Sequence, residues 1–292
     1  MRPTVFIQAN ARQMIGARIS AYSYTRNSRR AGDFDVHIID AADFPRLMLT
    51  GQSIVRGGHV RAWDPDDLQS FTPLRFAPPT LMSFAGRALV TDPDCFAVGD
   101  VAELLFDHDM GGMAIAAVPR PGHNRDPDYI ASSVMLLDCA QLGHWDFEAL
   151  LDRLFAHGMD YVDWMQLKYE KRSTIAALPP QWNSFDRFEP GTAILHTTKR
   201  RTQPWKSGLP VDYTLRESGP LDLLRRFVSR RYERHPDQRQ EAFIYALLAE
   251  MVDGGMLTRD ELVSEMAADH IRHDSLELIE RYRGWSFIEQ AA

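Results

Sequence analysis

The sequence predicts an α/β fold, in which short buried strands alternate with amphipathic helices. Near-continuous apolar runs at residues 113–118 and 133–137 suit strands that are buried on both faces. A helical spacing of apolar residues at 13–24 follows the first expected strand. Alternation of this kind is typical of a sheet that is at least partly parallel.

The individual elements follow from local patterns. Strands are expected at 5–9 (VFIQA), 35–40 (DVHIID), 88–91, 113–118, 133–137 and 193–196 (AILH). The most regular helix is expected at 145–157. One apolar stripe runs along it, formed by Phe147, Leu150, Leu151, Leu154 and Phe155. Residues 64–79 are rich in Asp and Pro, which predicts loop or short turns.

The pattern changes after about residue 210, where helical periodicity replaces the strands. Helices are expected at 221–235 (LDLLRRFVSRRYERH), 238–252 and 259–268, and the Gly254-Gly255 pair separates the last two. The chain is therefore predicted to have two parts. Residues 1–210 would form the body with the sheet, and residues 211–292 a helical C-terminal extension packed on it.

Composition limits the classes of function. A chain of 292 residues suits one large domain, or one domain with an extension. The formal net charge of −7 argues against a general nucleic-acid binder. The two cysteines, Cys95 and Cys139, cannot build a disulfide framework or a Cys-based zinc site. With a polar N-terminus and no apolar run of membrane length, we expect a cytoplasmic protein.

The stretch Asp92-Pro93-Asp94 directly follows the strand expected at 88–91. Ligands of open α/β sheets bind outside the carboxyl ends of the strands. Mg²⁺ and Mn²⁺ prefer oxygen ligands, and two carboxylates so close together repel each other unless a cation or several donors hold them. From these residues alone, a metal site and a simple polar turn both stay open.

The residues around this pair resemble glycosyltransferase family 8, which includes glycogenin and bacterial lipopolysaccharide galactosyl- and glucosyltransferases. TDPDCFAVGDVAELL at 91–105 matches the family's strand, Asp-X-Asp and Gly-Asp pattern. ILHTTKRRTQPWKSG at 194–208 supplies the family's later His and Pro-Trp. The resemblance spans residues 4–208 and implies the GT-A fold, a Rossmann-like mixed sheet flanked by helices.

The resemblance also implies a site for a metal ion and a nucleotide-sugar, most simply a UDP-sugar. Asp92, Asp94 and His196 would hold Mn²⁺ or Mg²⁺, and this mixed oxygen and nitrogen set suits Mn²⁺. Arg75 and Asp163 would contact or position the sugar. The nucleotide would lie against Ile7, Ala9, Asn10, Pro93, Lys199, Arg200 and Lys206. The last three belong to a stretch at 190–211 without any acid, which would offset the charge of a diphosphate.

Three positions depart from the family pattern. Ala131 replaces an Asn, although Ser132 and Ser133 would supply hydroxyls beside it. Trp164 follows Asp163 where the family has a Gln, and Gln166 comes almost one helical turn beyond Asp163. Gln203 stands where a phosphate-binding Lys is expected. These departures indicate either a divergent branch with another donor or acceptor, or an inactive relative.

The first hypothesis is a retaining, metal-dependent glycosyltransferase of the hexosyltransferase type, acting on a glycan or glycolipid acceptor. The second is a non-catalytic module that binds a nucleotide-sugar or a glycan. A phosphatase of the haloacid dehalogenase type fits less well. In that family the Asp pair lies near the N-terminus, whereas here it follows ninety-one residues. The basic residues 221–235 would either contact the inner face of an anionic membrane peripherally or form a solvated face over the core.

Overall fold

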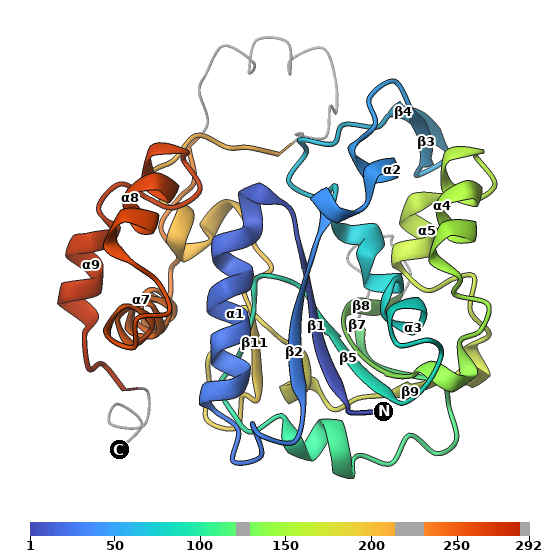
Figure 1. Cartoon of the computed structure of the whole chain (residues 1–292), viewed down its shortest axis with the longest axis horizontal. Helices are drawn as coiled ribbons and strands as arrows, with labels where there is room; N and C mark the ends of the chain where they lie inside the picture. The colour runs from blue at the N-terminus through green and yellow to red at the C-terminus, as the bar shows by residue number, and fades with distance from the viewer. Residues whose placement is uncertain (121–128, 214–230, 287–292) are drawn as a thin grey trace.

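The computed structural model describes residues 1–120, 129–213 and 231–286 (Figure 1). Its centre is a six-stranded mixed sheet with the strand order β2-β1-β5-β8-β7-β9. The strands are β1 (Thr4–Ala9), β2 (Asp35–Asp40), β5 (Arg87–Thr91), β7 (Ile115–Arg120), β8 (Tyr129–Asp138) and β9 (Ile175–Ala177). β1 pairs in parallel with β2 and β5, whereas β8 runs antiparallel to β5 and β7. The predicted mixed α/β sheet is confirmed.

Alternation along β1 divides its side chains between the two faces of the sheet. Val5 and Ile7 pack in the core that α1 (Met14–Arg26) covers. Phe6 points the other way and packs in the core that α4 (Phe147–Phe155) covers (Figure 1). The most regular helix expected from the sequence is thereby confirmed. Both faces of the sheet are buried, so a ligand can bind only at an edge. The edge at the C-terminal ends of the parallel strands β1 and β5 is where a site is expected.

A small second sheet brings distant residues to that edge. Its order is β10-β11-β6, with β10 at Ser184–Phe185, β11 at Ile194–His196 and β6 at Cys95–Ala97. β11 pairs antiparallel with β6, and the register places His196 opposite Cys95. Since Cys95 directly follows the Asp-Pro-Asp stretch, this pairing carries His196 to the end of β5.

The segment between β2 and β5 contains more structure than the sequence predicts. A hairpin, β3 (Ser53–Arg56) and β4 (His59–Ala62), follows the short helix α2 (Pro45–Met48). Within the Asp- and Pro-rich region, a 3₁₀ helix at Thr72–Phe76 carries Arg75 and leads into α3 (Pro78–Leu81). Further short turns of helix lie at Ala11–Gln13, Ala41–Asp43, Glu103–Asp107, Cys139–Gln141, α5 (Tyr161–Met165), Arg172–Thr174, Pro180–Asn183, Arg200–Thr202 and Pro204–Lys206.

The C-terminal helices pack against α1, beside the sheet (Figure 1). They are α7 (Gln238–Asp253), α8 (Arg259–Ala267) and α9 (Ser275–Tyr282), of which the sequence predicts the first two. Ile15 and Ile19 of α1 share one hydrophobic cluster with α7. Arg26 of α1 forms an ion pair with Glu250 of α7 at 2.8 Å. The boundary proposed near residue 210 is therefore bridged by both apolar packing and an ion pair.

The basic helix expected at 221–235 falls mostly on residues 214–230, which lie outside the described residues. The remainder of that prediction is wrong, because Arg231 forms a β-bridge with Pro210 and residues 232–235 are not helical. Within the described ranges, none of the helices combines the length and apolar character needed to cross a membrane.

Candidate functional site

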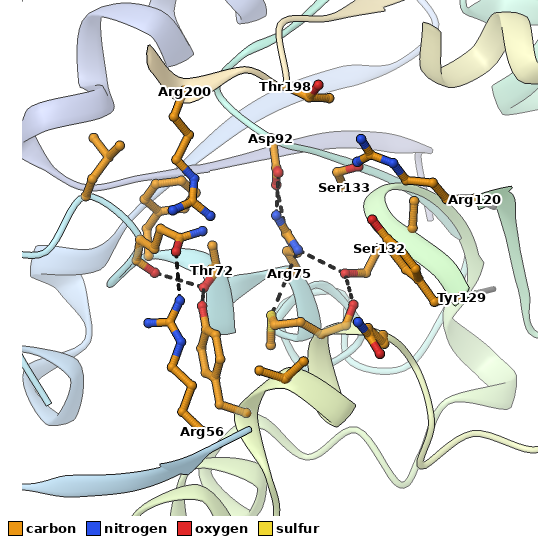
Figure 2. A pocket seen from close by; sticks show the side chains of 18 of the residues that line it. Arg56, Thr72, Arg75, Asp92, Arg120, Tyr129, Ser132, Ser133, Thr198 and Arg200 are labelled. Carbon is orange, nitrogen blue, oxygen red and sulfur yellow. Dashed lines mark hydrogen bonds and ion pairs between the residues drawn. The ribbon is translucent and has the colours of Figure 1, made fainter. Parts of the chain in front are cut away.

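A cavity of about 720 Å³ opens at the carboxyl edge of the main sheet. Its walls come from the Asp-Pro-Asp stretch after β5, the first half of β8, the helix α5 and the loop after β11. Seven of the predicted site residues line it, namely Arg75, Asp92, Pro93, Asp94, Asp163, His196 and Arg200. The fold thus collects side chains that are widely separated in the sequence, as Figure 2 shows for several of them.

Asp94 and His196 face each other in this cavity, with His196 Nε2 at 3.4 Å from Asp94 Oδ1. The other ring nitrogen, Nδ1, lies 2.8 Å from Asn183 Oδ1, and the Asn183 amide nitrogen donates to Ser133 Oγ at 3.0 Å. Because Asn183 Oδ1 only accepts, Nδ1 carries the proton. In a neutral imidazole, Nε2 then presents a lone pair to a carboxylate, an arrangement that a cation between them stabilises.

Asp92 lies beside this pair, but its carboxylate is already held by protein groups. Gln8 Nε2 donates to its Oδ1 at 2.5 Å, and Arg75 Nε donates to the same oxygen at 2.8 Å. A second Arg75 nitrogen binds Oδ2, so the ion pair is bidentate. Burial raises the pKa of Asp92 and the charge of Asp94 raises it further, against the opposing effect of Arg75. Direct binding of a metal by Asp92 stays a prediction.

Cys95 also offers a ligand atom here, since Asp94, Cys95 and His196 present atoms within 4.8 Å of one another. Burial raises the pKa of the Cys95 thiol well above its usual value, and both neighbouring carboxylates add to this. A metal binds a thiolate rather than a thiol. The donor set therefore fits a cation held by Asp94 and His196, and the protonated Cys95 thiol is not a ligand of it.

The floor of the cavity is built around Arg75. Its terminal nitrogen donates to Ser132 Oγ at 2.9 Å, and Ser132 in turn donates to the backbone oxygen of Met165 at 2.6 Å. This chain of contacts connects the 3₁₀ helix Thr72–Phe76, β8 and α5. Figure 2 shows Arg75 at the centre, pointing between Asp92 and Ser132.

The short helix α5 orients Trp164, which stands where the family pattern has a Gln, into the core. Asp163 and Gln166 both line the cavity. Trp164 points away from it, 3% exposed, and stacks on Phe76 with ring centroids 4.5 Å apart. The sequence therefore keeps an acid and an amide at the cavity, at a wider spacing than the family pattern. Asp163 is also paired with Lys168 at 2.7 Å.

Several residues of the cavity escape prediction from the sequence. Gln13, which precedes α1, is 1% exposed and lines the cavity, and neither polar atom of its amide has a hydrogen-bond partner among the described residues. Arg56 and Arg120 also line the cavity. Burial lowers the pKa of Arg200, and nearby Arg56 lowers it further. Gln203, in the place of the expected Lys, donates to Asp94 Oδ2 at 3.2 Å.

Five predicted nucleotide-binding residues are not among those lining the cavity. Ile7 and Ala9 are fully buried in the core beside α1. Asn10 lies at the end of β1, where its amide nitrogen donates to Asp67 O and Ser70 Oγ. Lys199 is exposed, and Lys206 is fully buried in an ion pair with Asp212. The ion pair with Asp212 already uses the Lys206 ammonium group, and a role for Lys206 in binding a diphosphate stays a prediction.

No model of a known protein family matches this sequence, and no curated protein matches it. Among solved structures, the chain is similar to the glycosyltransferase GlyE of Streptococcus pneumoniae TIGR4, with 15% identity and a TM-score of 0.50. The match covers 77% of this chain and 59% of GlyE, so this chain spans less than two thirds of that protein. This likeness confirms the GT-A type of fold.

Two other solved structures resemble the chain less closely, and the matches cover most of their lengths. The galactosyltransferase LgtC gives 13% identity and a TM-score of 0.45, over 69% of this chain and 89% of LgtC. Mouse xyloside xylosyltransferase 1 gives 16% identity and a TM-score of 0.43, over 67% of this chain and 97% of that protein. At these identities, membership of family 8 stays a prediction.

Proposed function

We propose that the protein is a metal-dependent glycosyltransferase that transfers a sugar from a nucleotide-sugar, a UDP-sugar, to an acceptor hydroxyl. The observation that carries this proposal is the Asp94–His196 pair, oriented by Asn183 and placed in a cavity at the carboxyl edge of the sheet. The names of the similar solved structures, all glycosyltransferases, agree with it.

The metal would be Mn²⁺ or Mg²⁺, held by Asp94 and His196, with Asp92 as the third predicted ligand. When bound, it would supply positive charge that offsets the diphosphate as the bond to the sugar breaks. Asn183 keeps the His196 ring in the orientation and tautomer that such a ligand needs. Arg75 balances the charge of Asp92 in the absence of other cations.

The nucleotide end of the donor would lie on the side of α1 and the loop after β11. Arg200 lines this side of the cavity with no carboxylate partner in the described part of the chain, and it would bind the diphosphate. Gln13 would hydrogen-bond the nucleotide, since a buried amide with both polar atoms unpaired is costly without a ligand. Both residues supplement the nucleotide contacts predicted from the sequence.

The sugar would lie over Arg75, Asp163 and Gln166. In the reaction, the bond between the anomeric carbon and the diphosphate oxygen breaks, a bond to the acceptor oxygen forms, and the hydroxyl proton is released. We propose retention of configuration and a hexose donor, with a glycan or glycolipid acceptor, as the family resemblance implies. A cytoplasmic protein that contacts the membrane peripherally remains part of this proposal.

A binding module without catalysis is the second candidate. The observation that favours it is the Asp92–Arg75 ion pair, which occupies both carboxylate oxygens of a predicted metal ligand. In that case the cavity would hold a nucleotide-sugar without breaking it. Binding and turnover separate the two candidates.

The test is release of UDP from a panel of UDP-sugars in the presence of Mn²⁺, with and without acceptors. We expect release with at least one donor, and loss of it in Asp94→Asn and His196→Ala. Asp66→Asn is the matched control, because Asp66 is exposed and is not among the residues lining the cavity. Tight binding of every donor without release would support the binding module and refute the enzyme.

A further inference from the structure

We propose that the acceptor carries an anionic group, a carboxylate or a phosphate, and that Arg120 binds it. This inference rests on the proposed function, because it names the substrate class of the same cavity. It concerns the side of the cavity opposite the proposed nucleotide position.

Arg120 stacks on an aromatic ring at the wall of the cavity. It is the last residue of β7, and its guanidinium carbon lies 4.3 Å from the centroid of the Phe185 ring. The Phe185 ring lies 5.6 Å from the ring of His196. Stacking engages the face of a guanidinium and leaves its N–H edges free to bind an oxyanion. The distance of Arg120 from the proposed metal ligand is therefore set by one intervening aromatic ring.

Among the described residues, the charge of Arg120 has no carboxylate partner. Its guanidinium stacks on Phe185 and forms no ion pair or side-chain hydrogen bond with a residue in the described ranges. Arg75 and Lys168, which also line the cavity, differ in this respect, since Arg75 is paired with Asp92 and Lys168 with Asp163. A half-buried guanidinium that lines a cavity and has no carboxylate partner among the described residues is suited to bind a carboxylate or phosphate of a ligand.

The position of Arg120 assigns the anion to the acceptor. Figure 2 shows Arg75 between two groups, with Arg56 and Arg200 on one side and Arg120 with Tyr129 on the other. In the proposed function the diphosphate would lie beside Arg200, which lines the same cavity as Asp94. Across the sugar position, Arg120 is thus left for a second negative charge.

Tyr129 gives this side the character of a sugar-binding wall. It is the direct neighbour of Arg120 in the β7–β8 pairing, and it also lines the cavity. Ser133, further along β8, brings a hydroxyl to the same side (Figure 2). An aromatic ring, hydroxyls and a guanidinium together fit a sugar ring that bears a carboxylate or phosphate.

The experiment compares acceptors that differ only in charge. Methyl hexosides, the 6-phosphates of the same methyl hexosides and the methyl glycosides of the matching uronic acids are added to the enzyme with Mn²⁺ and the UDP-sugar that it hydrolyses. We expect the charged acceptors to increase UDP release more than the neutral ones. In Arg120→Met, kcat/KM for the charged acceptors should fall about 10- to 100-fold, the range expected for lost hydrogen bonds to a charged group. Neutral acceptors and donor hydrolysis should change little.

Two control variants make this result specific. Arg120→Lys keeps the charge and should retain part of the preference. Arg187→Met removes an exposed arginine from the loop between β10 and β11, outside the residues lining the cavity, and should leave the preference intact. Equal loss in both methionine variants, or equal use of charged and neutral acceptors by the wild type, would overturn the inference.

A second arm tests whether the anion belongs to the donor instead. Hydrolysis of UDP-glucuronate and UDP-glucose is compared in wild type and Arg120→Met. A selective loss of UDP-glucuronate hydrolysis, with no change toward charged acceptors, would refute the acceptor assignment.

If no acceptor increases UDP release, the inference is tested by measuring how tightly the acceptors bind. Hexose 6-phosphates and methyl hexosides are titrated by NMR into the protein with Mn²⁺ and UDP. Stronger binding of the phosphate, weakened in Arg120→Met, supports the inference, whereas equal or absent binding of both overturns it. The proposed function fails separately, by an absence of UDP release with every donor.

Discussion

Replacing Asn183 by Leu should weaken metal binding although the proposed metal ligands themselves are unchanged. Asn183 is 1% exposed, and its Oδ1 accepts a hydrogen bond from His196 Nδ1 at 2.8 Å. Leucine has similar volume but no acceptor, so Nδ1–H loses its partner and the proton can move to Nε2, which faces Asp94. Loss of such an outer partner typically reduces metal affinity about 10- to 100-fold, or about 1.4–2.7 kcal/mol.

The assay is the dissociation constant of Mn²⁺ in the presence of saturating UDP, measured by electron paramagnetic resonance. Asn183→Asp keeps an acceptor oxygen and should retain more affinity than the leucine variant, while His196→Ala should lose most of it. Thermal unfolding of each variant shows whether the fold survives. Affinity in folded Asn183→Leu equal to that of the wild type would refute the proposed role of the Asn183–His196 contact.

Three further predictions concern stability. Arg75→Met leaves the buried Asp92 carboxylate without its bidentate partner and should cost about 3–5 kcal/mol in urea unfolding; the double variant with Asp92→Asn should be less destabilised than Arg75→Met alone. Hydrogen bonding from Arg26 lowers the pKa of Glu250, so this pair stabilises the folded state above the usual carboxyl pKa of about 4.3 and loses its contribution as the pH falls below it. Because the pair is partly exposed, Glu250→Gln should reduce the free energy of unfolding at pH 7 by less than about 1 kcal/mol and flatten its acid dependence; an unchanged pH profile would contradict this. Trp164→Ala should destabilise by about 3–5 kcal/mol, and Trp164→Gln should fail to raise UDP release, since this side chain lies in the core rather than at the cavity.

Elements with strong local patterns could be predicted from the sequence. β2 has the expected bounds, and the stripe of α4 identifies a helix that covers one face of the sheet. Elements defined by their partners could not. β6 has only three residues and exists through its pairing with β11, so it carries no periodicity of its own. The hairpin of β3 and β4 is turned by a Gly-Gly pair, a usable signal that its polar, exposed second strand conceals.

Several residues at the centre of the cavity could be predicted from the sequence, because they belong to the Asp-X-Asp and His motifs. Asp94 and His196 do face each other, and Arg75 does reach Asp92. What the sequence lacks is the pairing state of each cation. Lys206 and Arg120 are both basic residues in the sequence. Lys206 is buried against a carboxylate, whereas Arg120 lines the cavity without a carboxylate partner in the part of the chain that the structure describes.

The orientation of side chains in irregular segments is equally hidden in the sequence. The one-turn helix α5 turns Trp164 into the core and leaves Asp163 and Gln166 at the cavity. Gln13 lies in a short 3₁₀ turn where no periodicity distinguishes an inward amide from an outward one. Residues of this kind are found through burial and missing hydrogen-bond partners, which only the folded chain defines.

The most direct test of the central claim is a crystal structure of the protein grown with Mn²⁺ and UDP, with anomalous diffraction measured at the manganese edge. The account predicts an anomalous peak between the Asp94 carboxylate and His196 Nε2, with the UDP diphosphate on the same ion and Arg200 beside it. Ordered UDP in the cavity without manganese at Asp94 and His196, or manganese bound elsewhere, would contradict the account.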